Sequence, residues 1–549
     1  MQTKYVVVLG SLLSGIGKGI VTSSVAKLLS LYNYNAMPLK FDGYLNYDCG
    51  TMNPFRHGEV FVLEDGSEVD MDFGTYERFL NKNLNKSFTL TGGKLFSEMI
   101  EKERKGDFLG RDVQIIPHMT DLIIEKIERV SAQEELDVLI IEVGGTVGDI
   151  ENSYFVEAMR QLALRHRVVF IDVTYVPELG TVGEQKTKPT QIALRSLRQE
   201  GIQPNFVVCR SENKLDDKAR KKIALFSNLP PEHVIDDHDV KDIYAMPVTL
   251  MQQDFDKMLI KELGLEKMNI NPQQLYEWRK CIDAEKRKKP VSVAVVGKYV
   301  ELHDSYASVI QALHNAAHKH SADLTINWVE SETLEDSSIK GSLDILMKSD
   351  GILVPGGFGG RGTEGMIRAI EYARTNKVPY LGLCLGMQLM AIEFARNVCK
   401  LDGAGTREFG EAKHNVIDIM EEQKKINNMG GTMRLGAWQA KLKPGSLAHK
   451  IYGSETISER HRHRYELNNE YKKILEDNGL IVSGTTTDGA LAEFIEWRDS
   501  FGIATQAHPE FKSRPENPAP LFSAFVENAL LKSGAASEGK YSYNLSASV

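Results

Sequence analysis

The chain has 549 residues, which exceeds what one hydrophobic core holds and predicts two to four domains. Charged residues make up 26% of the chain and apolar residues 42%, as in ordinary soluble globular proteins, and the formal net charge of −9 argues against a general nucleic-acid-binding surface. The five cysteines are scattered, which fits a reducing compartment better than a disulfide framework. No apolar run reaches the roughly 20 residues of a membrane helix, so we expect a cytoplasmic protein with neither nucleic acid nor membrane as a partner.

The first half alternates strand-like runs with helical stretches, a pattern that predicts a parallel sheet covered by helices. The strand-like runs are VVVLG, AMPLKFD, LDVLIIEVGG, VVFIDVTYV and NFVVCR. The first of them leads into GSLLSGIGKGIVTSS, residues 10–24, a glycine-rich turn before a helix. Backbone N–H groups, the helix N-terminus and Lys18 could together hold an anion there, although the spacing differs from a standard P-loop. A glycine-rich turn without a ligand is the alternative.

Acidic and basic side chains are interleaved in three further stretches of the first half. Asp70 and Asp72 follow the KFDGYLNYDCG run, Glu142 ends a strand before two glycines, and GEQKTKPTQ carries two lysines. Mg²⁺ prefers hard oxygen ligands and usually takes one or two carboxylates besides phosphate groups. We therefore expect Mg²⁺ as a cofactor with Asp72 and Glu142 as its ligands, the alternative being ordinary solvated loop acids.

The character of the chain changes near residue 270. NPQQLYEWRKCIDAEKRKKP is polar and charged, so residues 271–291 are expected to form an exposed linker helix. The strand–helix alternation then restarts with VSVAVVGKYV, SYASVIQALHNAAHKH, DGILVPGG and PYLGL. The predicted fold class is α/β, with two doubly wound domains over residues 1–270 and 292–535. A small, polar tail over 536–549 is expected to be disordered.

The second half contains a candidate nucleophile. PYLGLCLGMQLMAIEFA places Cys384 between two glycines where a strand gives way to a helix, as in a G-x-nucleophile-x-G elbow. In ATQAHPEF, His508 and Glu510 lie two residues apart and, on an extended segment, would point to the same side. A lone cysteine or histidine is more often structural, but the combination predicts a catalytic triad of Cys384, His508 and Glu510. Backbone N–H groups of Gly356, Gly357 and Leu385 could bind an oxyanion.

The motifs LGLCLGMQ, VPGGFG and HPEF resemble those of class I (triad) glutamine amidotransferases, which release ammonia from glutamine through a glutamyl thioester. The resemblance spans about 292–535. It implies that Gln388, Glu408 in TREF and Arg464 in ERHRHRYE hold the charged groups of glutamine. Read without the resemblance, RHRHR is a charged, exposed strand.

Over nearly its whole length the chain resembles the CTP synthase family. Two motifs, DSYASVIQAL and GEQKTKPTQ, look closer to the eukaryotic members of that family. The motifs that carry this resemblance are SGIGKG, KFDGYLNYDCGTMNPFRHGEVFV, GGTVGDIE, GEQKTKPTQ, KKIALF, GGTMRLG and ERHRHRYE. It implies an N-terminal, P-loop-like amidoligase (synthetase) domain that phosphorylates O4 of UTP with Mg·ATP. Ammonia from the C-terminal domain would then displace phosphate at C4, so that the enzyme is a C–N ligase.

The resemblance also assigns nucleotide contacts. Those implied for ATP are Ser14, Gly15, Ile16, Gly17, Lys18, Gly19, Lys40, Asp72, Arg210, Asp239 and Val240. Those implied for UTP, and for CTP as a feedback inhibitor, are Ser14, Asp149, Ile150, Glu151, Lys186, Thr187, Lys188, Pro189, Thr190, Gln191 and Lys222. GTP is a candidate activator with Arg434 as its candidate contact. A homotetramer is expected, and filament formation stays open at the level of sequence.

Four positions depart from the family pattern: Ser11, Gly43, Thr75 and Ala307. They bear on loop geometry and nucleotide control rather than on the chemistry. Two other functions stay open at the level of sequence. One is an ATP-dependent amidotransferase of the cobyrinate diamide synthase type, and the other is an inactive nucleotide-binding scaffold that forms filaments.

Overall fold

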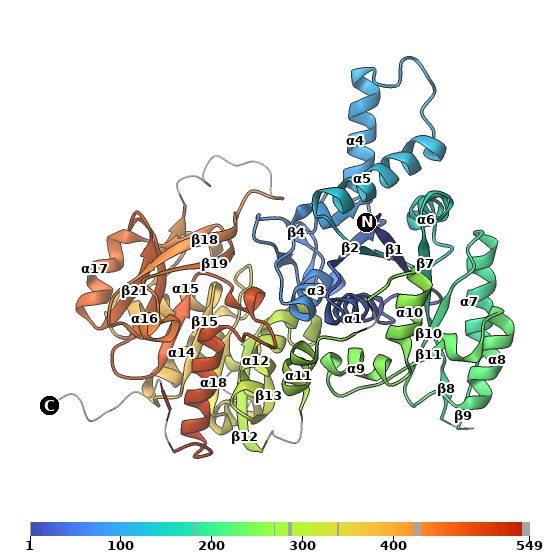
Figure 1. Cartoon of the computed structure of the whole chain (residues 1–549). Helices are drawn as coiled ribbons and strands as arrows, with labels where there is room; N and C mark the ends of the chain where they lie inside the picture. Colours follow the sequence, from blue (N-terminus) through green and yellow to red (C-terminus); the bar gives the residue numbers. More distant parts are fainter. Residues whose placement is uncertain are drawn as a thin grey trace. The chain divides into compact units, whose positions relative to one another are not determined.

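The computed structural model describes residues 2–540 apart from 181–182, 268, 284–287, 337–339, 421–422, 424–429 and 538. The chain forms two compact units, each with its own sheet (Figure 1). The first unit comprises Met1–Asp48 and Thr75–Ile282, and the second comprises Cys49–Gly74 and Asp283–Val549. The prediction of two α/β units is confirmed, whereas the predicted tail lies from residue 541 onward outside the described part of the chain.

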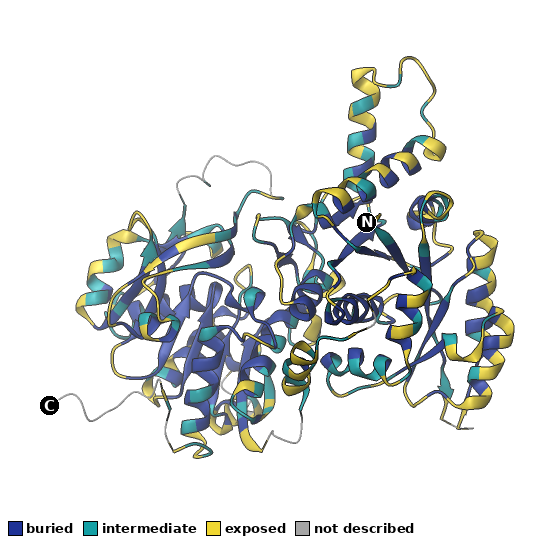
Figure 2. Cartoon of the chain, viewed as in Figure 1, coloured by how far each residue is buried: buried dark blue, intermediate teal, exposed yellow. Residues whose placement is uncertain are grey.

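A seven-stranded parallel sheet in the order β11-β10-β7-β1-β6-β2-β5 forms the centre of the first unit. Its strands are buried on both faces, as Figure 2 shows, which explains why they are continuous apolar runs rather than alternating ones. The strands are β1 (Lys4–Gly10), β2 (Ala36–Asp42), β5 (Thr89–Thr91), β6 (Val138–Val143), β7 (Val168–Tyr175), β10 (Phe206–Ser211) and β11 (Val234–His238).

Helices pack against this sheet, while α4 and the loop after it project away from it at the top of Figure 1. Within the described ranges, no helix combines the length and apolar character that crossing a membrane requires. A short two-stranded ribbon, β8 (Glu178–Leu179) with β9 (Glu184–Gln185), lies outside the main sheet. The helices are α1 (Lys18–Leu31), α3 (Asp72–Leu80), α4 (Gly92–Lys105), α5 (Thr120–Gln133), α6 (Ser153–Arg165), α7 (Lys188–Gln199), α8 (Asp217–Ser227), α9 (Met246–Met251), α10 (Phe255–Leu263) and α11 (Pro272–Ile282).

Helix α11 departs from the predicted exposed linker helix at one residue, Trp278, the only residue of this helix that is buried. Trp278 on this helix is fully buried and packs with Phe79 and Tyr244. Its indole N–H donates to the Tyr244 carbonyl at 3.0 Å, and the Lys27 ammonium lies 4.1 Å from the ring centroid. One aromatic side chain in a polar helix thus attaches α11 to the first unit.

The second unit is built on a nine-stranded sheet in the order β13-β12-β14-β15-β23-β22-β21-β18-β19. Neighbouring strands from β13 to β23 are parallel, and those from β23 to β19 are antiparallel. The strands are β12 (Lys289–Gly297), β13 (Ala322–Glu330), β14 (Gly351–Val354), β15 (Tyr380–Leu383), β18 (Arg434–Leu442), β19 (Thr456–His463), β21 (Leu480–Thr486), β22 (Ala492–Trp497) and β23 (Gly502–Thr505).

Helices cover both faces of the parallel part of this sheet. Along β12, Val293 and Val295 belong to one hydrophobic core, and Ala294 and Val296 to the other, because successive side chains alternate between the faces. A smaller sheet joins β16 (Ala404–Thr406), β17 (His414–Ile419) and β20 (Tyr465–Leu467). The helices are α12 (Ala307–Lys319), α13 (Lys340–Lys348), α14 (Thr363–Thr375), α15 (Leu385–Asn397), α16 (Leu447–Tyr452), α17 (Asn469–Asp477) and α18 (Pro520–Lys532).

An N-terminal segment, Cys49–Gly74, belongs to the second unit, although the linear division predicted from the sequence places it in the domain over 1–270. It carries α2 (Pro54–His57) and a ribbon of β3 (Phe61–Val62) and β4 (Glu68–Val69). Strand β19 holds this segment: the Arg460 guanidinium lies 3.1 Å from the Glu64 carboxylate, and that of Arg462 lies 2.8 Å from Glu68. These ion pairs join residues nearly 400 positions apart, so no local pattern could reveal them.

Candidate active sites

The turn around Cys384 has the geometry of a nucleophile elbow. Strand β15 ends at Leu383, α15 begins at Leu385, and Cys384 between them has φ 49° and ψ −99°. A positive φ at a residue with a Cβ atom is strained. A Cβ on Gly386 would lie 2.2 Å from the Val354 carbonyl oxygen, and one on Gly382 would lie 2.7 Å from the Tyr380 hydroxyl. The flanking glycines are therefore required for this turn, as the sequence predicts.

His508 and Glu510 are in contact, with 2.7 Å between Nδ1 and Oε1. The backbone differs from the predicted extended segment, because Glu510 lies in a 3-10 turn, Pro509–Lys512, that begins directly after His508. Burial disfavours the imidazolium, but the Glu510 carboxylate and the Cys384 sulfur outweigh it and raise the pKa of His508 to about 10. His508 is thus protonated at neutral pH, which favours a thiolate at Cys384.

The triad residues share one cavity within the second unit. Cys384, His508 and Glu510 line it together with Gly356 and Gly357. A Cβ on Gly356 would lie 2.8 Å from Cε1 of His508 and 3.6 Å from Cβ of Cys384, so the backbone after β14 lies directly against the triad. The N–H of Leu385 belongs to the first turn of α15 and has no partner inside the helix. The structure thus brings together all residues predicted for the nucleophile, the base and the oxyanion.

Sequence reasoning missed several residues of this cavity. Pro54, Glu59 and Val60 of the Cys49–Gly74 segment line it, as does Arg462. Gln506, which is fully buried, donates its amide to the Cys384 sulfur at 3.6 Å. In the sequence, the signal that could have indicated a role for Gln506 is its position two residues before His508.

The residues predicted to recognise glutamine, Gln388, Glu408 and Arg464, are not among those that line the cavity. The Gln388 amide donates to the Tyr465 carbonyl at 3.0 Å and lies 3.4 Å from the Gln506 side chain. The Glu408 carboxylate accepts the N–H of Gly359 at 2.7 Å. Arg464 instead donates to Gln423 at 2.8 Å and to Thr432 at 2.9 Å. Their roles toward substrate stay predictions.

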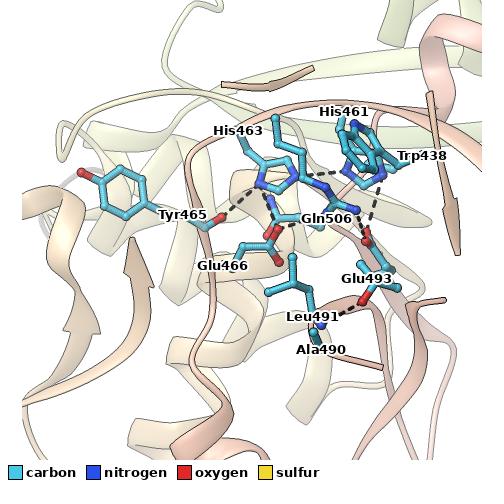
Figure 3. Close-up of polar contacts among 12 residues, drawn as sticks. Trp438, His461, His463, Tyr465, Glu466, Ala490, Leu491, Glu493 and Gln506 are labelled. Carbon is cyan, nitrogen blue, oxygen red and sulfur yellow. Dashed lines mark hydrogen bonds and ion pairs between the residues drawn. The ribbon is translucent and has the colours of Figure 1, made fainter. Parts of the chain in front are cut away.

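A buried polar network lies beside Gln506 (Figure 3). His461 and His463 of β19 are 3.0 Å apart, and each lies 3.5 Å from a carboxylate, that of Glu493 and of Glu466 respectively. Burial, followed by the Arg434 charge, holds the pKa of both imidazoles well below the usual range. The two histidines are therefore neutral. Strand β19 is not the exposed charged strand that its composition suggests. Arg460 on one side of the strand is buried, and so are His461 and His463 on the other side.

The candidate GTP contact Arg434 belongs to the same network. Its guanidinium binds Glu493 at 2.6 Å and Glu466 at 3.1 Å, and only 7% of the residue is exposed. It neutralises two buried carboxylates, and burial raises the pKa of both. Arg434 thus has a structural role that the sequence did not indicate.

The glycine-rich loop predicted to bind phosphate joins β1 to α1 in the first unit. Gly15 and Gly17 have φ 73° and 92°, which favours glycine at both positions. The Lys18 ammonium donates to the Gly145 carbonyl at 2.7 Å. Its side chain crosses Gly10, where a Cβ would lie 2.7 Å from Lys18 Cδ. The loop after β1 is therefore tied to the loop after β6, at the edge where parallel sheets bind ligands.

A carboxyl group is buried below this loop. Asp172 of β7 has no solvent exposure and accepts the Ser11 hydroxyl at 2.5 Å. Burial raises the pKa of Asp172 to about 7, against the effects of the Ser11 hydrogen bond and the Lys18 charge. Ser11, a departure from the family pattern, thus has a definite partner.

Of the predicted metal ligands, Glu142 lies at the end of β6 in the first unit. Its carboxylate contacts the Tyr76 hydroxyl and lies 3.5 Å from the Lys40 ammonium. Asp72 belongs to the segment that joins the second unit, and its N–H donates to Asp70 at 2.9 Å. Among the described residues, no group of three or more His, Cys, Asp or Glu side chains could hold a metal ion by itself. The magnesium site stays a prediction.

Apart from Asp72, the predicted nucleotide contacts belong to the first unit. Arg210, at the end of β10, binds Asp239 after β11 at 2.5 Å. Lys186 binds Glu184 at 2.6 Å. Asp149 accepts the Thr146 N–H at 3.1 Å. The structure thus brings Arg210 and Asp239 together. The other predicted contacts lie on separate elements: Ile150 and Glu151 in the turn before α6, Thr187, Lys188, Pro189, Thr190 and Gln191 at the start of α7, Lys222 on α8, and Val240 after β11.

Comparison with known proteins decides the family. A model of the CTP synthase N-terminus matches residues 4–265, and a model of class-I glutamine amidotransferases matches residues 301–528. A CTP synthase of Caldanaerobacter subterraneus subsp. tengcongensis is 51% identical over 535 residues, covering 96% of this chain and 98% of that protein. The chain belongs to the CTP synthase family. The CTP synthases of Thermococcus gammatolerans and Geobacillus kaustophilus are 48% and 47% identical, each over 96% of this chain and over 99% and 100% of their own lengths.

Among solved structures, the chain is similar to the glutaminase domain of a Trypanosoma brucei CTPS with bound acivicin. The two are 40% identical, and the match covers 44% of this chain and 93% of that one with a TM-score of 0.41.

One departure from the CTP synthase family pattern has a steric explanation. A Cβ on Gly43 would lie 2.6 Å from the carbonyl oxygen of Glu151, so a larger residue would displace this turn. Gly43 therefore fixes the spacing between the loop after β2 and the predicted pyrimidine-binding turn. Thr75 accepts a hydrogen bond from Arg78 at 3.3 Å, and nothing in the structure explains Ala307.

Proposed function

We propose that the protein makes CTP from UTP, using ATP and the amide nitrogen of glutamine. The observation that carries this proposal is the assembled triad of Cys384, His508 and Glu510 in one unit of a chain whose other unit carries the phosphate loop. Membership of the CTP synthase family gives the reaction. A cobyrinate diamide synthase activity and an inactive scaffold are not favoured, because the curated relatives that match over 96% of the chain are CTP synthases.

In the second unit, the Cys384 thiolate would attack the amide carbon of glutamine. We assign the N–H groups of Gly357 and Leu385 to the stabilisation of the oxyanion, and losing one such donor typically costs about 10²- to 10³-fold in rate. Protonated His508 would give its Nε2 proton to the departing nitrogen, since Nδ1 is bound to Glu510. Ammonia leaves, and a water deprotonated by His508 then hydrolyses the thioester to glutamate.

In the first unit, the γ-phosphoryl group of ATP would pass to O4 of UTP, and ammonia would then replace phosphate at C4. Lys18 and Lys40 lie at the carboxyl edge of the sheet, where their charges can offset those of the phosphates. Glu142 is buried and offers hard carboxylate oxygens, which suits Mg²⁺, and we assign Asp72 as its second ligand. When bound, Mg²⁺ would neutralise the charge of the ATP phosphates.

Feedback by CTP, activation by GTP, a homotetramer that forms filaments and a cytoplasmic location are further parts of this proposal. Large apolar side chains that are individually exposed on the first unit support self-association, because burying them between subunits would be favourable. They include Leu109 and Ile150, which are 88% and 86% exposed, and Ile115 and Ile116.

The test is to supply glutamine labelled with ¹⁵N in the amide together with ATP, Mg²⁺ and UTP. We expect CTP that carries ¹⁵N at N4, and one glutamate and one ADP for each CTP. Glutamate release without CTP, in the presence of all substrates, would refute the synthetase activity. Unlabelled CTP, formed from traces of ammonium, would refute transfer from glutamine.

A further inference from the structure

A buried lysine that the mechanism does not use lies beneath the glycine loop, residues 356–360 after β14. Lys298 follows the last residue of β12, and only 2% of it is exposed. Its ammonium donates to the Phe358 carbonyl at 3.2 Å and also to the Gly359 carbonyl. The Lys298 carbonyl in turn accepts a hydrogen bond from Arg361, just beyond the loop. A buried ammonium thus faces two consecutive carbonyl groups of one loop.

The same loop is held from its other side by Glu408. The carboxylate accepts the N–H of Gly359, which belongs to the peptide group whose carbonyl, that of Phe358, faces Lys298. In a trans peptide the C=O and N–H bonds point in opposite directions. Lys298 and Glu408 therefore bind opposite edges of a single peptide plane and fix its orientation.

The loop is rich in glycine. Gly356, Gly357, Gly359 and Gly360 surround Phe358, whose side chain is 42% exposed, and Gly359 has φ 78°. Glycine peptides rotate more readily than others because no Cβ restricts them. Burial lowers the pKa of Lys298 to about 8 against the opposing effect of Glu408, so charge is retained at neutral pH.

We propose that Lys298 is a positioning residue of the glutamine site, which orients the Phe358–Gly359 peptide and thereby the oxyanion donor of Gly357. Lys298 itself does not touch the triad. It acts through the loop, and Glu408 acts as its counterpart from the opposite edge. This inference rests on the proposed glutaminase activity of the second unit.

The experiment replaces Lys298 by Met in the full chain, which keeps the length of the side chain and removes the ammonium. We expect kcat for glutamate release to fall at least tenfold, because a misaligned oxyanion donor acts on the transition state. CTP formation from added ammonium and the alkylation rate of Cys384 by iodoacetamide should stay within twofold of the parent. Hydrogen exchange of the peptide over 356–361 should accelerate at least tenfold.

Lys532→Met, on α18 of the same unit, is the control, because the Lys532 ammonium also donates to a backbone carbonyl, that of Ser349 at 3.2 Å. It should leave every readout unchanged. Lys298→Gln serves as a second variant if the Met variant is poorly folded. Unchanged kcat and unchanged exchange would overturn the proposal, as would a parallel loss of ammonia-dependent synthesis and Cys384 alkylation. Hydrogen exchange tests whether Lys298 orders the loop even if the parent protein releases no glutamate. The absence of glutamate release by the parent would refute the proposed function and not the role of Lys298.

Discussion

At the scale of single residues, the reactivity of the second unit depends on the charge of His508. The Glu510 carboxylate 2.7 Å from Nδ1 is the largest effect that favours the imidazolium, and burial opposes it. Because the pKa of His508 is raised to about 10, the ring stays charged until the pH rises through that value. The Cys384 thiolate thus has a cationic neighbour over the whole physiological range.

Replacing Glu510 by Gln should lower the pKa of His508 and so reduce the thiolate fraction at neutral pH. We expect the alkylation rate of Cys384 at pH 7 to fall about tenfold, and kcat for glutamine hydrolysis to fall by about 10²- to 10⁴-fold. Mass analysis of the Cys384 peptide provides the measurement, and an unchanged rate in the variant would contradict this role of Glu510.

Asp172 makes the stability of the first unit depend on pH. Its pKa of about 7 in the folded chain exceeds the ordinary 3.8, so the folded state binds more protons than the unfolded state between these values. The free energy of unfolding should therefore decrease as the pH rises from about 4 to about 7, by up to about 4 kcal/mol.

The Asp172→Asn variant, without nucleotides, should lose less stability between pH 5 and pH 8. Asparagine keeps an acceptor for Ser11 and carries no charge. We expect the decrease in Tm over this interval to be smaller than in the parent by at least about 4 °C. Asp107→Asn, at an exposed aspartate, is the control. Parallel Tm curves for parent and Asp172→Asn would contradict the assignment.

At the scale of elements, the sites lie where strands end. In the second unit, Lys298, the glycine loop and Cys384 follow β12, β14 and β15, which are neighbours in the sheet. Parallel strands bring their carboxyl ends to one edge, so residues distant in sequence meet there. Such strands and their turns could be predicted from apolar runs and glycines, as for β1, β2, β14 and β15.

Strand β19 shows why other elements could not be predicted. RHRHR suggests exposure, yet Arg460, His461 and His463 are buried. Arg460 binds the distant Glu64, and the two histidines contact each other and the carboxylates of Glu493 on β22 and Glu466 on β20. Because Glu64 and Glu493 are distant in the sequence, the composition of the strand alone wrongly predicts that its side chains are exposed.

The elbow itself is testable as an element. In Gly386→Ala, the added Cβ would lie 2.2 Å from a backbone carbonyl, so β14 or α15 must shift. We expect a loss of about 3 kcal/mol in unfolding free energy, with glutamine-dependent synthesis reduced more than ammonia-dependent synthesis. In Gly341→Ala, a Cβ meets nothing within 4 Å, and helix propensity should make this control neutral or slightly stabilising. Denaturant unfolding distinguishes the two, and equal stability would contradict the steric argument.

At the scale of the whole molecule, the division into two α/β units and the triad were predictable from the sequence, because repeated strand–helix alternation and the G-x-C-x-G turn are local signals. The membership of Cys49–Gly74 in the second unit was not, since it depends on contacts of β19 with Glu64 and Glu68. The nucleotide and magnesium contacts came from family resemblance and stay predictions.

The central claim is that a thiol in the second unit releases the ammonia that the first unit consumes. The most direct measurement compares CTP formation by Cys384→Ala with glutamine and with ammonium as the nitrogen source. We predict no detectable synthesis from glutamine and a rate from ammonium within twofold of the parent. Loss of both rates to the same extent, or survival of glutamine-dependent synthesis, would contradict the account.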